Sequence, residues 1–154
     1  MWCATEHVLY TRRWGKEELI VGMYVDDLII IGARVEDIDS FKREMAAHFR
    51  MSDFGALFYY LSIMVRQGKE ALMLGQCTYA SKLLEQSGMA EGKPRVTPME
   101  EWLKLTKAST AVRVDATLIR SIVGGLCYLV HTRPDITFAV GYVSRFMEDP
   151  QEDH

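Results

Sequence analysis

The chain has 154 residues, 49% of them hydrophobic, and a formal net charge of −3 at pH 7. That length fits one domain or two small subdomains, and the hydrophobic content supports a packed core and argues against a disordered chain. The charge lacks the basic excess that marks many nucleic-acid-binding proteins, so bulk charge gives no support to nucleic-acid binding.

The first third of the sequence predicts β-strands. Residues 7–14 and 18–24 are rich in β-branched and aromatic side chains, and residues 28–31 are a short run of Leu and Ile that ends at Gly32. An apolar run between turn signals is typical of a strand that is covered on both faces. We therefore expect the adjacent Asp26 and Asp27 to lie at the bend between two antiparallel strands.

A helix and a second hairpin are predicted next. Apolar side chains recur at helical spacing at Ile38, Phe41, Met45 and Phe49. Residues 57–65 then predict a further strand, and residues 67–69 turn the chain into a returning strand over residues 71–74. Asp53-Phe54-Gly55, between the helix and this hairpin, is interpreted as a turn and not as a kinase-type metal triplet, because the other kinase motifs are missing.

From Gly75 to the end the pattern is mainly helical. Residues 91–113 are polar, contain two prolines and predict a loop. Asp115 is a plausible N-cap for a strongly apolar helix that contains Gly124-Gly125, a pair that is tolerated where another backbone packs close. Pro134 lies near the start of the last predicted helix, where its missing N–H does no harm. We place the domain boundary between a strand-rich region, residues 1–74, and a helical region, residues 75–154.

The cysteines and the apolar runs bear on the cellular compartment. Cys3, Cys77 and Cys127 are far apart, and their odd number argues against a disulfide framework and a zinc site. No apolar run reaches the roughly 18 residues of a membrane helix, and the first residues have neither a basic leader nor an apolar segment. We therefore expect an intracellular protein of the cytoplasm or nucleus, without membrane contact.

Two interpretations of Asp26 and Asp27 stay open on the residues alone. Aspartate is common in turns because its side chain accepts hydrogen bonds from nearby backbone N–H groups. However, no glycine follows the pair, although tight two-residue hairpins prefer Asp-Gly. Two carboxylates on a stiff hairpin can instead hold Mg²⁺ at an exposed edge.

The sequence around these aspartates resembles the signature of reverse transcriptases. Residues 24–32 read YVDDLIIIG, and nearly all of residues 19–154 is similar, in order, to the copia-type retrotransposon branch of that family. The other matching stretches are FKREMAAHFRMSDFGALFYYL, GQCTYASKLLEQSGM, TPM and IRSIVGGLCYLVHTRPDITFAVGYVSRFMEDP.

The resemblance implies a fragment of an RNA-directed DNA polymerase with an α+β fold. Residues 1–74 would be a partial palm, made of antiparallel hairpins and a helix, and residues 75–154 a helical thumb. Asp26 and Asp27 would be catalytic and would bind Mg²⁺ or Mn²⁺ for two-metal nucleotidyl transfer in the intact parent. The partners implied are an RNA or DNA template-primer and deoxynucleoside triphosphates. Primer or other nucleic-acid contacts are implied for Tyr24, Val25, Leu61, Ser62 and Lys82.

Two departures from the family pattern shape the expected activity. The family usually reads YFLGIEV where residues 59–65 read YYLSIMV, so Ser62 replaces a glycine. The family's first catalytic aspartate and its fingers precede the hairpin by many residues, whereas Tyr24 stands near the start of this sequence. We therefore expect a truncated chain that binds Mg²⁺ weakly and does not polymerise alone, unless another chain supplies the fingers. The alternative is a non-enzymatic remnant that binds nucleic acid or protein.

Two sets of charged residues in the helical region have a structural and a functional interpretation. Arg133 and Asp135 are expected to tie two helices together or to cap them, which we favour over acid–base chemistry. Scattered basic side chains form either a solvated surface or a set of phosphate contacts, and both interpretations stay open. These are Lys82, Lys93, Arg95, Lys104, Lys107 and Arg113.

Overall fold

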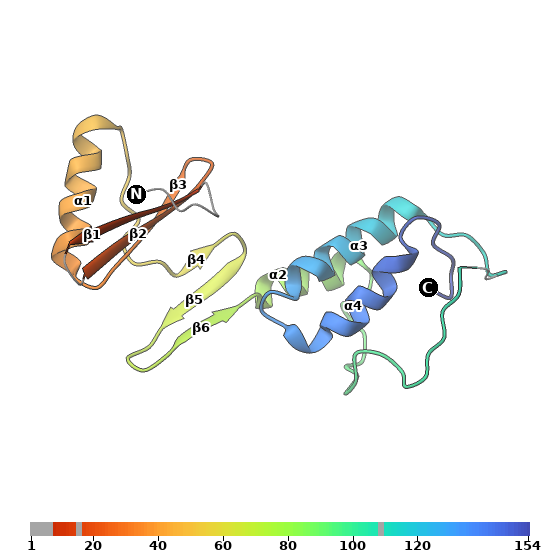
Figure 1. Ribbon diagram of the computed structural model, residues 1–154. Helices are drawn as coiled ribbons and strands as arrows, with labels where there is room; N and C mark the ends of the chain where they lie inside the picture. The colour runs from red at the N-terminus through yellow and green to blue at the C-terminus, as the bar shows by residue number, and fades with distance from the viewer. Residues whose placement is uncertain (1–7, 15–16, 108–109) are drawn as a thin grey trace. The chain divides into compact units, whose positions relative to one another are not determined.

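The computed structural model (Figure 1) describes residues 8–14, 17–107 and 110–154. It divides the chain into two units, Met1–Leu57 and Phe58–His154, each with a three-stranded antiparallel sheet and helical structure. The fold class is therefore α+β, as the sequence predicts. Cys3 and His7, the first residue of the expected first strand, lie outside the described residues. The assignment of residues 1–74 and 75–154 to two functional regions stays a prediction.

The first unit contains one sheet in the order β1-β2-β3 and one described helix. Strand β2 is central: its residues 17–22 pair with β1, and its residues 19–24 pair with β3. The bounds are β1 (Leu9–Trp14), β2 (Glu17–Tyr24), β3 (Asp27–Gly32) and α1 (Val35–His48). These elements lie close to the positions that strand alternation and helical spacing predict.

Helix α1 covers one face of this sheet. Leu19 is buried on β2, and a β-carbon added at Gly32 would lie 2.9 Å from Leu19 Cδ1 and 3.1 Å from Ile38 Cγ1 of α1. Arg12 reaches Glu44 of α1 from the same face, at 3.0 Å. Because side chains alternate across a strand, Ile31 falls on the opposite face, where it is 58% exposed. The expectation that β3 is covered on both faces is therefore wrong, since the helix of this unit packs on a single face.

The second unit begins with a sheet in the order β4-β5-β6. The predicted continuous strand over residues 57–65 is wrong, because a two-residue turn at Leu61 and Ser62 interrupts it. Both turn residues have positive φ, 46° and 64°. The sequence did not indicate this conformation, because neither residue is a glycine or an asparagine. The strands are β4 (Tyr59–Tyr60), β5 (Ile63–Gln67) and β6 (Leu72–Gly75).

Helices form the rest of the second unit. The side chain of Asp115 accepts a hydrogen bond from the Thr117 N–H at 2.8 Å, which confirms the predicted N-cap of α3. The single last helix that was predicted is instead a short α-helix with a 3₁₀ turn at each end. The elements are α2 (Cys77–Gln86), α3 (Ala116–Leu129), η1 (Pro134–Ile136), α4 (Thr137–Val143) and η2 (Ser144–Phe146).

Apolar side chains from α2, α3 and α4 build the core of the second unit. Leu83, Val123, Leu129 and Val140 are buried there. Cys77 and Cys127 are free and exposed thiols on α2 and α3. Over the described ranges, no helix has the length and hydropathy that crossing a membrane requires.

Candidate metal and primer site

The turn of the β2–β3 hairpin lies one residue earlier than expected. Tyr24 and Asp27 pair across the hairpin, so Val25 and Asp26 are the two turn residues and Asp27 is already the first residue of β3. Val25 has a φ of 53°. The prediction that both aspartates lie at the bend is therefore correct for Asp26 and wrong for Asp27. The strand pattern of the sequence located the hairpin. The sequence has no glycine there, however, that would have indicated which two residues form the turn.

Val25 holds a strained backbone conformation. A β-branched residue in the left-handed region is a genuine outlier, and this conformation costs about 1–2 kcal/mol for an L-residue. Such strain persists only where the surrounding structure imposes it, here the paired strands β2 and β3, and it is enriched at functional sites. The strained turn therefore makes this hairpin a candidate site independently of its sequence motif.

Tyr24 and Asp27 share the sheet face that α1 does not cover. They are direct cross-strand partners, and the alternation of side chains puts both opposite the face that holds Leu19. Tyr24 is 53% exposed, and Asp26 and Asp27 are exposed as well. Among the described residues, neither carboxylate makes a hydrogen bond or an ion pair. Both are therefore open to a ligand.

The donor chemistry of this hairpin fits part of a Mg²⁺ or Mn²⁺ site. Hard divalent ions prefer carboxylate oxygens, and Mg²⁺ is commonly bound through one or two carboxylates with waters and substrate phosphates. Asp26 and Asp27 supply two such groups next to each other in sequence. The described part of the chain contains no cluster of three or more His, Cys, Asp or Glu side chains suited to a metal. Within the described residues, the hairpin therefore provides two carboxylates and no third ligand of these types.

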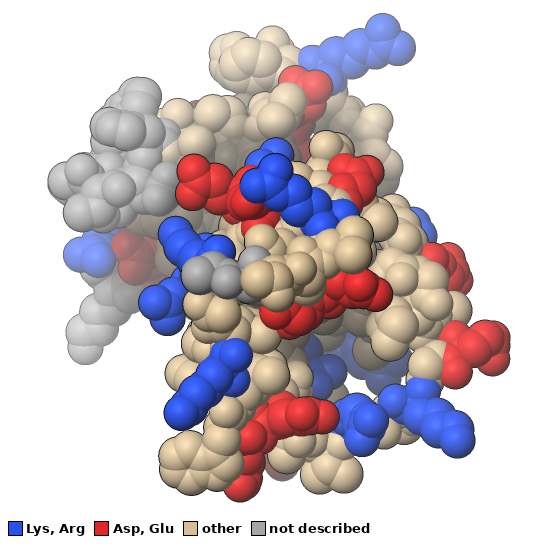
Figure 2. All heavy atoms as spheres, turned by 90° about the vertical axis from the view of Figure 1, so that its right-hand side faces the viewer, with Lys and Arg blue, Asp and Glu red and all other residues tan. Residues whose placement is uncertain are grey.

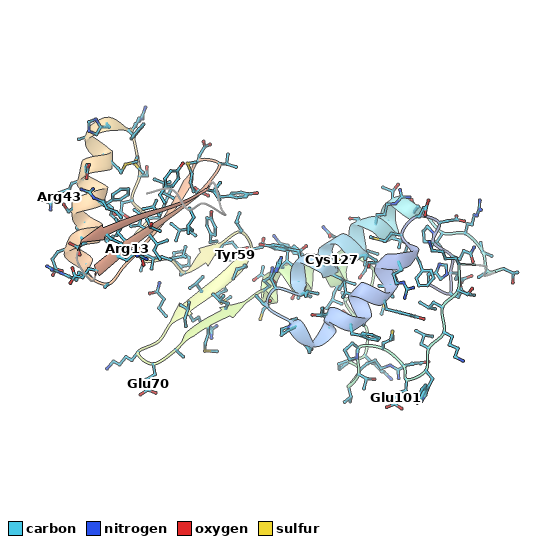
Figure 3. The ribbon with its side chains drawn as sticks, in the orientation of Figure 1. Arg13, Arg43, Tyr59, Glu70, Glu101 and Cys127 are labelled. Atoms are coloured by element: carbon cyan, nitrogen blue, oxygen red, sulfur yellow. The ribbon has the colours of Figure 1, made fainter. Side chains whose placement is uncertain are left out.

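A second strained turn lies at the tip of the β4–β5 hairpin, where Leu61 and Ser62 both have positive φ. This conformation explains in physical terms why glycine suits the position of Ser62, since glycine has no β-carbon to clash. The neighbouring Phe58 and Tyr59 are 71% and 47% exposed, and Tyr59 is labelled in Figure 3. The tip therefore combines a strained backbone with exposed aromatic side chains.

The support of this tip comes from a residue that sequence reasoning missed. The hydroxyl of Tyr128 on α3 donates a hydrogen bond to the backbone carbonyl of Leu61. The two residues are 67 positions apart in the chain, so no local pattern could have paired them.

Lys82 is exposed on α2 and, within the described residues, makes no ion pair. Arg113, by contrast, pairs with Asp149 at 3.1 Å. On the face drawn in Figure 2, Lys and Arg side chains are interspersed with Asp and Glu. Tyr24, Val25, Asp26 and Asp27 belong to the first unit, whereas Leu61, Ser62 and Lys82 belong to the second.

Arg133 and Asp135 form a local ion pair. Their side chains make two hydrogen bonds of 2.8 and 2.7 Å across Pro134, at the start of η1. Hydrogen bonding to Arg133 lowers the pKa of Asp135, and both side chains are more than half exposed. The pair stiffens this turn and does not connect two helices, which corrects the first of the two expected structural roles.

Asp53 organises the turn after α1. Its carboxylate accepts a hydrogen bond from the Gly55 N–H at 2.9 Å and one from Lys42 Nζ at 3.0 Å. The Gly55 N–H, followed by Lys42, lowers the pKa of Asp53. Gly55 has a φ of 76°, which glycine adopts without strain. These contacts account for the Asp-Phe-Gly triplet as a turn.

Residues 2–101 match the sequence profile of the family described as reverse transcriptase (RNA-dependent DNA polymerase). An uncharacterised mitochondrial protein of Arabidopsis thaliana is 38% identical over 129 residues, which is 83% of this chain and 53% of that protein. The retrovirus-related Pol polyprotein from transposon RE1 of A. thaliana is 36% identical over 95% of this chain and 10% of its own length.

The corresponding polyprotein from the tobacco transposon TNT 1-94 is 35% identical over 95% of this chain and 12% of its own length. The chain thus spans about half of the first relative and about a tenth of each polyprotein. No solved structure matches the chain.

Proposed function

The chain belongs to the reverse transcriptase (RNA-dependent DNA polymerase) family, and from this premise we propose that it holds a divalent metal ion and the end of a primer. The resemblance to copia-type retrotransposon reverse transcriptases is confirmed by the family match and by the transposon polyproteins among its relatives. The observation that carries the proposal is the β2–β3 turn, where two exposed carboxylates directly follow the strained Val25 and, among the described residues, have no protein partner.

In this proposal, the strand-rich region, residues 1–74, is part of a polymerase palm and residues 75–154 are a thumb. The paired hairpins of the first unit support the palm, because they hold Asp26 at a rigid turn. The packed helices α2, α3 and α4 support the thumb, because they form a separate apolar core beyond β6.

Asp26 and Asp27 would hold the metal, with Mg²⁺ the first candidate and Mn²⁺ the second. When bound, the ion would supply activation of a primer hydroxyl and stabilisation of a leaving phosphate oxygen. Tyr24 shares the open sheet face with Asp27, and its ring would contact the end of the primer. Val25 would fix the direction of the turn between them, since its φ departs from the usual region.

The substrates proposed for the whole protein are a template-primer of RNA or DNA and deoxynucleoside triphosphates. A two-metal centre needs more carboxylates than Asp26 and Asp27, so a further segment of a longer protein or a second chain would complete it. The exposed aromatic residues near Leu61 and Ser62 would stack against the nucleic acid, and Lys82 would contact a phosphate.

The test is Mg²⁺-dependent binding of a DNA primer annealed to an RNA template, measured by fluorescence anisotropy for the chain and for Asp26→Ala. We expect Mg²⁺ to strengthen binding to the unmodified chain and to have little effect on Asp26→Ala. Asp39→Ala is the matched control, because Asp39 is also exposed and lies in the same unit, on α1. Equal Mg²⁺ dependence in all three proteins would refute the proposal.

A further inference from the structure

The tip of the β4–β5 hairpin combines two strained turn residues with a short strand ladder. Leu61 and Ser62 occupy the left-handed region, which disfavours side chains with a β-carbon. Strand β4 has only two residues, and the next backbone hydrogen bond of the ladder runs from the Val65 N–H to the Phe58 carbonyl at 2.9 Å. A ladder this short provides few bonds to offset two strained residues.

Tyr128 supplies the missing support from α3. Its hydroxyl donates a hydrogen bond to the carbonyl of Leu61, at the first residue of the turn. The ring itself is held edge-on by two neighbours: Tyr79, at a centroid distance of 5.2 Å, and His131, at 5.7 Å. Because these contacts come from α2 and from the residues just after α3, the helical part of the unit, and not the hairpin, positions the ring that carries the hydroxyl.

We infer that Tyr128 is a positioning residue, which locks the β4–β5 tip to α3 and thereby sets how Phe58 and Tyr59 are presented to a primer–template duplex. The part that concerns the duplex rests on the proposed function. Phe58 and Tyr59 lie two to three residues before the turn, and both are exposed enough to stack on bases. Release of the carbonyl of Leu61 would let the tip relax and would spread these rings over several orientations.

The experiment compares Tyr128→Phe with Tyr79→Phe. Tyr128→Phe keeps the ring packing and removes the hydrogen bond to Leu61. Tyr79→Phe is the matched control, because it removes a hydroxyl that donates to the Gly125 carbonyl at 3.3 Å in the same pair of helices. Amide hydrogen exchange is measured at Val65 and in α3, and binding is measured with a DNA primer annealed to an RNA template.

For Tyr128→Phe we expect exchange at Val65 to be about tenfold faster, as the loss of one hydrogen bond implies, with little change in α3. Duplex binding should weaken by about fivefold to tenfold. Tyr79→Phe should leave the exchange at Val65 and the duplex affinity near those of the unmodified chain. This pattern would separate positioning of the tip from a general contribution to stability.

The inference is overturned if Val65 in Tyr128→Phe exchanges at the original rate, or if α3 accelerates as much as Val65. Unchanged duplex affinity in Tyr128→Phe, with an unmodified chain that does bind, would also overturn it. An unmodified chain that binds no duplex would instead refute the proposed function, and the exchange data alone would then decide whether Tyr128 holds the tip.

Discussion

Leu83 of α2 and Gly125 of α3 meet so closely that a β-carbon on Gly125 would lie 2.7 Å from Leu83 Cδ1. The Tyr79 hydroxyl, 3.3 Å from the same position, donates to the Gly125 carbonyl at this crossing. The expectation that another backbone packs close to Gly124-Gly125 is therefore wrong, because the atoms close to Gly125 belong to side chains of α2, those of Leu83 and Tyr79. At Gly124 nothing lies within 4 Å of such a β-carbon.

Gly125→Ala should therefore destabilise the second unit. Leu83 is buried and has little room to move away from a new methyl group, so overpacking should outweigh the gain in helix propensity and cost about 1 kcal/mol or more of unfolding free energy. The measurement is denaturant unfolding followed by circular dichroism.

Gly124→Ala is the control for Gly125→Ala. It makes the same chemical change one residue away, in open space, and should stabilise the helix by up to about 1 kcal/mol. Equal effects of the two substitutions would contradict the close contact between α2 and α3.

The sequence could predict features whose cause is local. Asp115 was recognisable as a helix cap because the capping bond to Thr117 spans two residues. The β2–β3 hairpin was located to within one residue, because two apolar strands bracket the aspartates. At the candidate site, this was enough to single out Asp26 and Asp27 as exposed carboxylates.

The sequence could not predict features that depend on distant contacts or on unusual backbone. Leu61 and Ser62 are not residues that usually mark a turn, so the sequence pattern predicts one uninterrupted strand across them. The bond from Tyr128 to Leu61, which supports that turn, joins residues that are distant in the chain. The positive φ of Val25 is likewise imposed by the pairing of β2 with β3, and not by the propensity of valine.

Ser62→Gly should stabilise the second unit. Ser62 has a φ of 64° and, among the described residues, its side chain makes no hydrogen bond that the substitution would remove. Glycine relieves the steric cost of this conformation but adds freedom to the unfolded chain, so we expect a net gain of about 0.5–1 kcal/mol. Thermal and denaturant unfolding both report this difference.

The same change at Ser81 should have the opposite sign. Ser81 is exposed in the interior of α2, where glycine is a poorer helix former than serine, so Ser81→Gly should cost roughly a few tenths of a kcal/mol. A loss of stability in both variants would show that the positive φ at Ser62 is not a strained conformation.

Lys82→Gln should reduce the salt dependence of duplex binding. If Lys82 neutralises one phosphate, its removal lowers the slope of log affinity against log salt concentration by roughly 0.7–0.9. Arg113→Gln is the comparison. The guanidinium of Arg113 already pairs with Asp149, so this substitution should change the slope less. The slope is measured by titration of the duplex at several salt concentrations. An unchanged slope in Lys82→Gln would assign Lys82 to the solvated surface.

Asp53→Asn should make the first unit less stable at neutral pH but not in acid. The Gly55 N–H and Lys42 lower the pKa of Asp53 below its ordinary value of 3.8. A carboxylate with a lowered folded-state pKa stabilises the fold above the unfolded-state pKa, and this stabilisation is lost as the pH falls through the lower value. The stability difference between the chain and Asp53→Asn should therefore be full at pH 6 and shrink below about pH 4.

Asparagine at position 53 still offers an oxygen to the Gly55 N–H but no charge to Lys42, whereas Asp53→Ala removes both contacts. The alanine variant should therefore stay destabilised in acid. The protonated Asp53 of the unmodified chain has lost its charge there but can still accept the hydrogen bond from the Gly55 N–H, whereas alanine cannot. Unfolding of the three proteins at pH 7 and pH 3 separates the two contacts. A constant difference between the chain and Asp53→Asn at both values would show that the carboxylate charge does not stabilise this turn.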